Sequence, residues 1–217
     1  MSHPGIRQEE YGQAVNSSFA NRPVYEAVKR VLDLTTSGVA LAFSLPFWLW
    51  AFAAVTLTDG WPFLYSQTRV GRNGRVFVIH KFRSMIKDAE KDGIPVYSEK
   101  RDPRVTGVGH IMRKTAIDEI PQLLSIFRGD MSWVGPRPAR PEEVEEYLRD
   151  IPNYSLRHLV RPGLTGFAQV YASDYGNIVE KLAYDLHYIR HRSLWLDLVL
   201  FLKSWARTLL VRWDAAR

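Results

Sequence analysis

A long stretch without charge constrains this chain more than any other feature of its sequence. No charged residue lies between Leu34 and Thr58, and the segment is almost wholly apolar. By length it could cross a bilayer, because a transmembrane helix needs about 20 apolar residues. Pro46 stands at its middle, however, where a proline removes a helical hydrogen bond and bends the helix axis. The segment is therefore not a simple spanning helix.

Charges on both sides of the stretch indicate how it meets a membrane. The flanking basic residues are Arg22, Lys29 and Arg30 before it, and Arg69 and Arg72 after it. Basic residues favour the cytoplasmic side, so both ends are expected there. Each half would span only about 18 Å at 1.5 Å per residue, short of the roughly 30 Å hydrocarbon core. We therefore predict a re-entrant membrane helix within residues 23–58, broken at Ser44 and Pro46. A kinked spanning helix is the alternative.

Two adjacent carboxylates, Asp118 and Glu119, lie just before Pro121. Proline is tolerated in the first turn of a helix, so the pair is expected at or next to a helix N-terminus, with the helix over Gln122–Phe127. That end of a helix carries unpaired N–H groups and a partial positive charge, which favour bound anions.

Three interpretations fit this acidic pair. Thr115-x-x-Asp118 has the form of a capping box, which would make the pair purely structural. Hard oxygen ligands also suit Mg²⁺, and a carboxylate can attack phosphorus in covalent catalysis. The nearby cations are Arg113, Lys114, Arg128, Arg137 and Arg140. A solvated helix end does not need so many cations, whereas a diphosphate site does.

The run from Asp102 to Pro138 resembles the signature of the bacterial sugar transferase family. These are monotopic phosphoglycosyltransferases, which load a sugar phosphate onto polyprenyl phosphate. Three further blocks agree with the family: Gln67–Met85, Arg161–Val170 and Glu180–Ile189. The likeness covers nearly everything from Tyr25 to about Arg207 in order, so it is far more specific than a single short motif.

The resemblance implies a reaction and roles for particular residues. A nucleotide sugar, with UDP as the expected nucleotide, would donate a sugar phosphate to undecaprenyl phosphate and release UMP. Asp118 would be the nucleophile that forms a covalent phosphosugar intermediate, and Glu119 would hold the cofactor Mg²⁺. The expected phosphate ligands are Lys81, Arg113, Arg137 and Arg161. Asp185, in the family's Asp-x-x-Tyr position, is either a supporting catalytic residue or part of a structural salt bridge.

The remaining patterns predict an α+β fold with a small catalytic domain. Asn73-Gly74 between two β-rich runs indicates a β-hairpin. The expected elements are strands over Phe63–Val70, Arg75–His80 and Phe167–Val170, and helices over Pro141–Asp150 and Ile178–His191. The apolar C-terminal segment carries spaced basic residues and predicts an interfacial amphipathic helix. The expected organisation is a flexible arm (1–22), the membrane helix (23–58), the catalytic domain (59–193) and the interfacial segment (194–217).

Composition limits the classes of partner. The net charge of +6 permits nucleic acid, an anionic membrane surface or phosphorylated substrates. No nucleic-acid-binding motif is recognisable, so no nucleic acid is expected. A non-enzymatic surface module of a glycan-assembly complex is the other rival, but it does not need an acidic pair among arginines.

The resemblance also implies where the protein acts and with what. The expected location is the cytoplasmic face of a bacterial inner membrane, in contact with its lipids. A second copy of the chain or downstream glycosyltransferases are the expected protein partners. The chain lacks the multi-span N-terminal region of longer family members, so a minimal form is expected. The sequence does not identify the sugar or the polysaccharide.

Overall fold

The computed structural model describes residues 22–87, 89, 102–172 and 177–209. All of the expected N-terminal arm except Arg22 lies outside this part. The helices are α2 (Pro23–Phe43), α3 (Leu45–Asp59), α4 (Gly107–Lys114), α5 (Leu123–Arg128), α6 (Pro141–Asp150), α7 (Phe167–Tyr171), α8 (Ile178–His191) and α9 (Leu194–Leu209). Three 3₁₀ helices are η1 (Arg72–Gly74), η2 (Ile117–Gln122) and η3 (Tyr154–Leu159). The strands β1 (Leu64–Val70) and β2 (Val76–Phe82) form one sheet, and β3 (Ser132–Val134) and β4 (Gly163–Thr165) form another.

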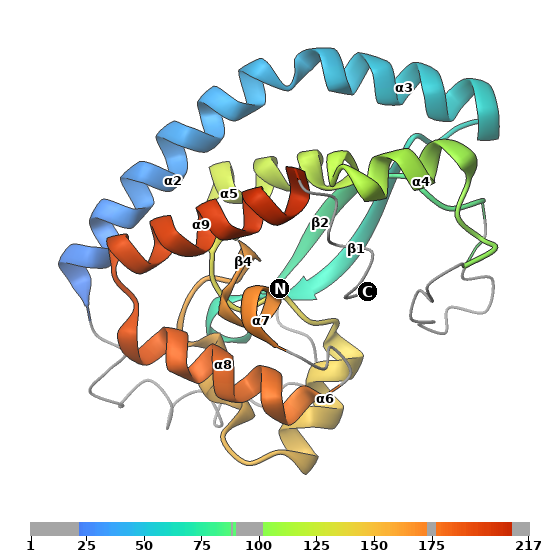
Figure 1. Ribbon diagram of the computed structural model, residues 1–217. Helices are drawn as coiled ribbons and strands as arrows, with labels where there is room; N and C mark the ends of the chain where they lie inside the picture. The colour runs from blue at the N-terminus through green and yellow to red at the C-terminus, as the bar shows by residue number, and fades with distance from the viewer. Residues whose placement is uncertain (1–21, 88, 90–101, 173–176, 210–217) are drawn as a thin grey trace.

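The fold is mixed α+β but mostly helical, and an arch of two helices dominates its shape. Figure 1 shows α2 and α3 running over the remaining elements, with α4, α5 and α9 beneath them. The two helices meet at an angle of 54°. Among the described helices none alone is long and apolar enough to cross a membrane, whereas α2 and α3 together are, by length and composition.

The break between α2 and α3 lies where the sequence predicts it. Ser44 separates the helices, and Pro46 lies in the first turn of α3, where a proline needs no hydrogen-bond partner. The Ser44 hydroxyl donates to the Leu41 carbonyl at 2.8 Å, and the Trp48 indole donates to that hydroxyl at 3.2 Å. Side-chain bonds therefore supplement the backbone where the helical ladder is interrupted.

Both ends of the arch are attached to the same body. The Arg22 guanidinium at the start of α2 donates to the carbonyls of Arg190 and Arg192 at 2.8 and 2.6 Å. At the end of α3, the Arg83 guanidinium donates to the carbonyls of Asp59 and Gly60, each at 2.7 Å. The start of α2 and the end of α3 are thus both bonded to the rest of the protein.

The face of α2 that contacts the rest of the protein carries polar residues, whereas many of the exposed residues of α2 are large and apolar. Lys29 forms an ion pair with Asp197 of α9 at 2.6 Å. One turn later, the buried Asp33 carboxylate accepts from the Ser132 hydroxyl at 3.1 Å. Residues four apart share one face of a helix, so this stripe bonds α2 to α9 and to β3. Large apolar side chains are exposed elsewhere on the pair: Val24, Val31, Val39, Phe43, Leu45, Leu49 and Leu57.

The predicted hairpin is present with the expected turn. β1 and β2 pair antiparallel, and Asn73 and Gly74 between them have φ values of 55° and 70°. Both are in the left-handed region that Asn and Gly tolerate best. Lys81, expected at the end of a strand, lies within β2 opposite Tyr65.

The predicted strand over Phe167–Val170 is wrong, because these residues form helix α7. A short apolar run fits a strand or a helix equally well, and tertiary contacts decide between them. Here Phe167 and Tyr171 pack their rings 4.6 Å apart at helical spacing, and Val170 enters the core formed with α8 and α9. The extended part of this region is the short strand β4, which pairs parallel with β3.

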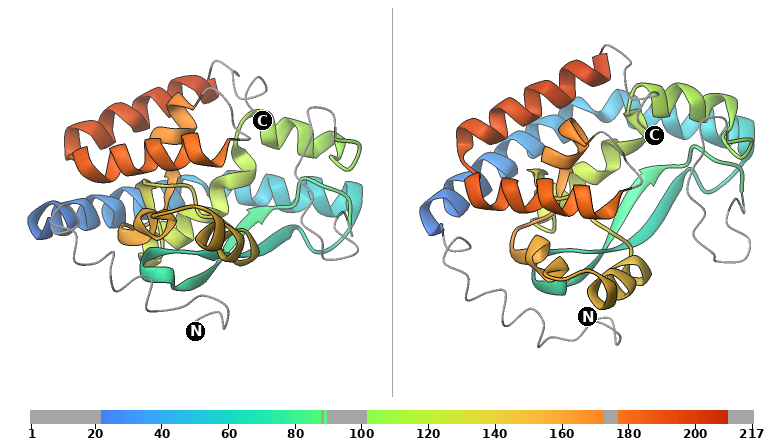
Figure 2. Two further views of the ribbon diagram at one scale, coloured as in Figure 1. Left: turned by 90° about the horizontal axis from the view of Figure 1, so that it is seen from below. Right: turned by 60° about the horizontal axis from the view of Figure 1, so that its bottom comes forward.

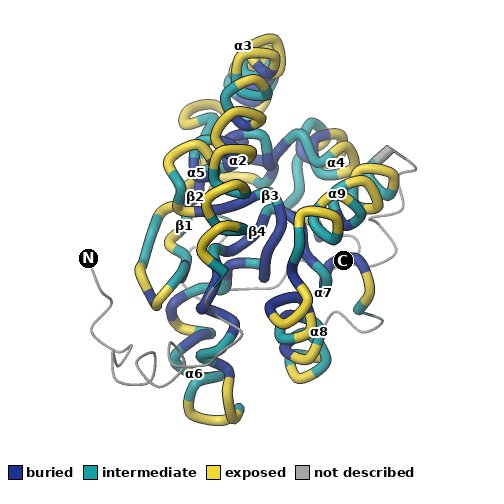
Figure 3. The backbone as a smooth tube through the Cα atoms, turned by 90° about the vertical axis from the view of Figure 1, so that its left-hand side faces the viewer, coloured by how far each residue is buried: buried dark blue, intermediate teal, exposed yellow. Residues whose placement is uncertain are grey.

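The helices predicted over Pro141–Asp150 and Ile178–His191 are confirmed as α6 and α8. α6 is less solvated than its glutamates indicate, because Val144 is fully buried. Of the predicted C-terminal segment, residues 194–209 form α9, and residues 210–217 lie outside the described part of the chain. The apolar residues of α9 divide between Leu200 in the core and the exposed Trp195 and Trp205. Figure 2 shows α9 above α8, and Figure 3 shows buried backbone along β3 and β4 with exposed outer turns on α2 and α3.

The attachment of the start of α2 and the end of α3 to the same body leads to a prediction about membrane topology. The natural chain has no cysteine, so single cysteines report without background. We expect Val24→Cys at the start of α2 and Arg75→Cys on the hairpin to react from the same side of the membrane. The measurement is labelling by an impermeant thiol reagent in intact cells and in opened membranes. Labelling of Val24→Cys alone from outside intact cells would contradict the re-entrant arrangement.

Candidate active site

The acidic pair lies in a tight 3₁₀ turn rather than at a capped α-helix. α4 ends at Lys114, Ala116 adopts a left-handed conformation with φ 55°, and η2 begins at Ile117. The capping-box interpretation does not describe Thr115, because Ala116 is the N-cap residue and the Thr115 hydroxyl donates back to the Ile111 carbonyl at 2.8 Å. The carboxylates therefore lie in the first turn of η2, which begins directly after the left-handed Ala116.

Asp118 and Glu119 are almost removed from solvent, with 4% and 7% of their surfaces exposed. Buried carboxylates need cationic or hydrogen-bonding partners. Lys81 and Arg137 supply such partners to Glu119, since each forms an ion pair with its Oε1, at 2.8 and 3.0 Å. Strand β2, turn η2 and the loop after β3 thus converge on one oxygen atom.

Lys81 links the two carboxylates electrostatically. Burial lowers the pKa of Lys81, and the Glu119 carboxylate opposes this effect. Asp118 also acts to raise the lysine's pKa, which places both carboxylates within its electrostatic range. The site therefore combines two acidic groups with cations that can bind phosphate oxygens.

Arg113 lies on α4, just ahead of the acidic turn. Its Nε donates to the Ser84 hydroxyl at 2.9 Å. Ser84 follows β2, and its carbonyl accepts from the Thr106 backbone N–H at 3.1 Å. Arg113 is thus held beside the end of the strand that carries Lys81, and its role as a phosphate ligand stays a prediction.

The loop that carries Arg137 is held by its carbonyl groups. The donors come from β4, η3 and β1: Gly163 N–H to Pro136 at 2.9 Å, Arg157 to Arg137 at 2.9 Å, Arg69 to Pro138 at 3.1 Å and Val70 N–H to Ala139 at 3.0 Å. Sequence reasoning missed both arginine donors. Arg69 lies within one of the family-like blocks, which was a usable signal, but no motif marks Arg157.

Asp185 forms the structural salt bridge that was one of its two predicted roles. Its Oδ2 accepts from Nε and Nη2 of Arg157 at 3.0 and 2.8 Å, and both residues are buried. Burial acts to lower the pKa of Arg157, but Tyr154 and Asp185 raise it by more, so the guanidinium stays charged. Asp185 therefore reaches the site indirectly, through Arg157 and the Arg137 carbonyl.

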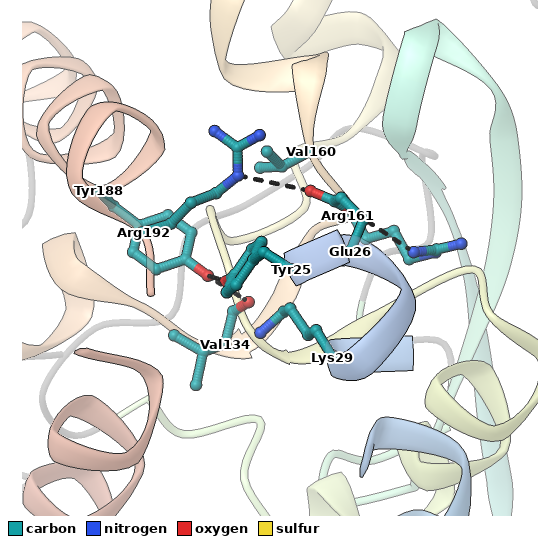
Figure 4. A pocket seen from close by; sticks show the side chains of 8 residues that line it. All are labelled: Tyr25, Glu26, Lys29, Val134, Val160, Arg161, Tyr188 and Arg192. Carbon is teal, nitrogen blue, oxygen red and sulfur yellow. Dashed lines mark hydrogen bonds and ion pairs between the residues drawn. The ribbon is translucent and has the colours of Figure 1, made fainter. Parts of the chain in front are cut away.

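Arg161 has partners in a different place. Figure 4 shows it at a small pocket beside Tyr25, Glu26 and Arg192. It forms an ion pair with Glu26 at 3.7 Å and donates to the Gly129 carbonyl at 3.0 Å. No contact recorded for Arg161 in the described part of the chain joins it to Asp118 or Glu119. Its role as a phosphate ligand stays a prediction without support from these contacts.

The site can hold phosphate oxygens with its cations and can offer a carboxylate as a nucleophile or a metal ligand. The model for the family described as bacterial sugar transferase matches residues 24–210. The chain therefore belongs to the bacterial sugar transferase family.

Curated relatives agree with this assignment. The chain is 39% identical over 196 residues to a UDP-N-acetylgalactosamine-undecaprenyl-phosphate N-acetylgalactosaminephosphotransferase of Aeromonas hydrophila, covering 89% of this chain and 46% of that protein. It is 42% identical over 182 residues to a UDP-glucose:undecaprenyl-phosphate glucose-1-phosphate transferase of Caulobacter vibrioides, covering 81% and 67%. It is 37% identical over 199 residues to the exopolysaccharide production protein ExoY of Sinorhizobium fredii, covering 85% and 87%. The chain thus spans less than half of the first relative and most of the third.

The close approach of the Arg137 loop to β4 generates a stability prediction. A Cβ on Gly135 would lie 2.4 Å from the Arg161 carbonyl oxygen and 2.9 Å from the Gly163 nitrogen. Backbone atoms cannot yield as a flexible side chain does, so Gly135→Ala should separate the loop from β4. We expect a loss of about 1–3 kcal/mol or more of unfolding free energy, measured by thermal or denaturant unfolding.

Gly107→Ala is the matched control, because a Cβ at that position meets nothing within 4 Å. It lies in the first turn of α4, where alanine favours the helix more than glycine does. Equal stability of the two variants would contradict the steric argument.

Proposed function

We propose that this protein transfers a sugar 1-phosphate from a UDP-sugar to undecaprenyl phosphate and releases UMP. The names of the relatives in Aeromonas and Caulobacter state this class of reaction for those proteins. The observation that carries the proposal is the buried pair Asp118–Glu119 beside Lys81 and Arg137. Donor and acceptor are both polyanions, and such a site offers cations for both.

A covalent route solves the problem of bringing two anions together. Asp118 attacks the β-phosphorus of the donor, the bond to the bridging oxygen breaks, and UMP leaves with the electron pair. The product is a phosphosugar–aspartyl intermediate. A phosphate oxygen of undecaprenyl phosphate then attacks the same phosphorus, and the Asp118 carboxylate is released. The two anionic substrates never meet directly.

The proposed cations act on the phosphate oxygens. Lys81 and Arg137 share Oε1 of Glu119. A bound diphosphate offers them more negative charge than one carboxylate, so both can turn to the phosphates while remaining close to Glu119. The planar fork of Arg137 suits two-point contact with phosphate, and Arg113 adds a third cation from α4.

The chemistry of the donor set fits Mg²⁺. No group of three His, Cys, Asp or Glu side chains that could hold a metal occurs in the described ranges. Mg²⁺ commonly takes one or two carboxylates and completes its shell with water and substrate phosphates. Glu119, with Asp118 adjacent, provides that minimal set. Bound Mg²⁺ would neutralise charge on the diphosphate and on the departing UMP.

We also propose that the arch is a re-entrant membrane anchor, with the catalytic body on the cytoplasmic face of a bacterial inner membrane. The exposed apolar residues of α2 and α3 and the attachment of both their ends to one body support this arrangement. The lipid substrate carries its phosphate at the membrane surface. The exposed Trp195 and Trp205 suit α9 to the same interface.

The nucleophile is tested by replacing Asp118 with asparagine. Asp118→Asn keeps the shape of the side chain, so folding should persist while turnover falls by about 10⁴-fold or more. The measurement is UMP release from a UDP-sugar in detergent with undecaprenyl phosphate, on protein checked for deamidation. Substantial activity in undeamidated Asp118→Asn would sink the covalent route.

The metal role of Glu119 has a separate test. Glu119→Gln should lower the rate by orders of magnitude and move the Mg²⁺ titration of UMP release to higher concentration. Glu142→Gln on α6 removes a carboxylate outside the site and serves as the control. An unchanged Mg²⁺ titration in an active Glu119→Gln enzyme would refute this role.

A further inference from the structure

A buried arginine, Arg157, binds the backbone of the loop that carries Arg137. Arg157 in η3 is 7% exposed, and all of its recorded bonds are internal. Its Nη2 donates to the Arg137 carbonyl at 2.9 Å and to Asp185 at 2.8 Å, and its Nη1 donates to the Tyr154 hydroxyl at 2.7 Å. One guanidinium therefore joins the loop to α8 and to the core.

The Arg137 loop depends on such donors because of its own sequence. Pro136 and Pro138 flank Arg137, and a proline has no N–H to donate. Two of the loop's backbone donors are thus missing, and most of its attachment is through carbonyls, beside one N–H bond from Gly135 to the Thr165 carbonyl at 2.9 Å. The carbonyl of Arg137 itself is the one that Arg157 binds.

The bond from Arg157 to the Arg137 carbonyl acts on the residue whose side chain reaches the acidic pair. The Arg137 side chain forms the ion pair with Glu119, so its backbone orientation sets where that guanidinium points. Arg69 holds the next carbonyl, that of Pro138, at 3.1 Å. Two arginines from different elements therefore hold the peptide units around Arg137.

We propose that Arg157, held by Asp185 and Tyr154, is a positioning residue that aims Arg137 at the diphosphate of the donor. The inference rests on the proposed function, since it assumes that Arg137 binds the donor's phosphates. Arg157 does not touch the substrate; it acts through the Arg137 carbonyl. Pre-organisation of this kind lowers the cost of ordering the loop when the ligand binds.

Asp185 makes this arrangement possible. A buried guanidinium without a counter-ion is costly, and removing one partner of a buried pair is strongly destabilising. Asp185 supplies that charge from α8, and Tyr154 supplies a neutral acceptor on the other side. One N–H of the Arg157 Nη2 atom thus remains to donate to the Arg137 carbonyl.

A double-mutant cycle tests the proposal. The variants are Arg157→Gln, Arg137→Ala and the double variant, and the measurement is the affinity for UDP with Mg²⁺ by calorimetry. We expect Arg157→Gln to weaken UDP binding by about tenfold. In the Arg137→Ala background the same change should have less than about a twofold effect, because the group that it positions is gone. Arg157→Lys should recover part of the affinity, since it keeps a charged donor without the fork.

Two further variants keep the test decisive. Arg192→Gln removes another buried arginine, one that bonds Ile189 and Glu26 away from the loop, and should leave UDP affinity unchanged. If Arg157→Gln does not fold, Asp185→Asn loosens the same guanidinium and replaces it in the cycle.

The outcomes separate the two hypotheses. Equal losses from Arg157→Gln with and without Arg137 would overturn the positioning role and leave the proposed function standing. Wild-type affinity in the Arg137→Ala variant, together with no UMP release by the natural protein, would overturn the proposed function itself.

Discussion

The structure depends on providing partners for one buried carboxylate, that of Glu119. Glu119 shares one oxygen between Lys81 and Arg137, which come from a strand and a loop far apart in the sequence. A buried charge without partners would be costly, so the hairpin, η2 and the loop after β3 must stay assembled together. The two cations that pair with Glu119 are of the kind that also binds phosphate oxygens.

Arginines elsewhere show that net positive charge has more than one use in this protein. Arg30 donates to the last carbonyls of α5, those of Ile126 and Phe127, and Arg22 donates to those at the end of α8. Cations at helix C-termini satisfy free carbonyls and complement the helix dipole. The net charge of +6 therefore cannot be interpreted as so many phosphate contacts, and the partners of Arg161 illustrate the point.

The same arginines join the arch to the catalytic body. α2 contacts α5, α8 and α9 through Arg30, Arg22 and Lys29, while its outer residues remain apolar and exposed. An apolar exterior over a polar inner face suits a helix between lipid and protein. The proposed lipid substrate would thus meet an active site in the same body to which both ends of the α2–α3 arch are bonded.

The sequence by itself determined the features that depend on neighbouring residues. Ser44 and Pro46 fixed the break, Asn73-Gly74 fixed the hairpin turn, and the order Asp118-Glu119-Pro121 fixed a helical turn carrying the acidic pair. Only the tertiary structure decided which cations meet Glu119, that Arg161 bonds Glu26, that Arg157 supports the loop, and that Phe167–Tyr171 is a helix. The physical reason is range: proline and glycine act on local backbone angles, whereas the partner of a long charged side chain depends on elements brought together by folding.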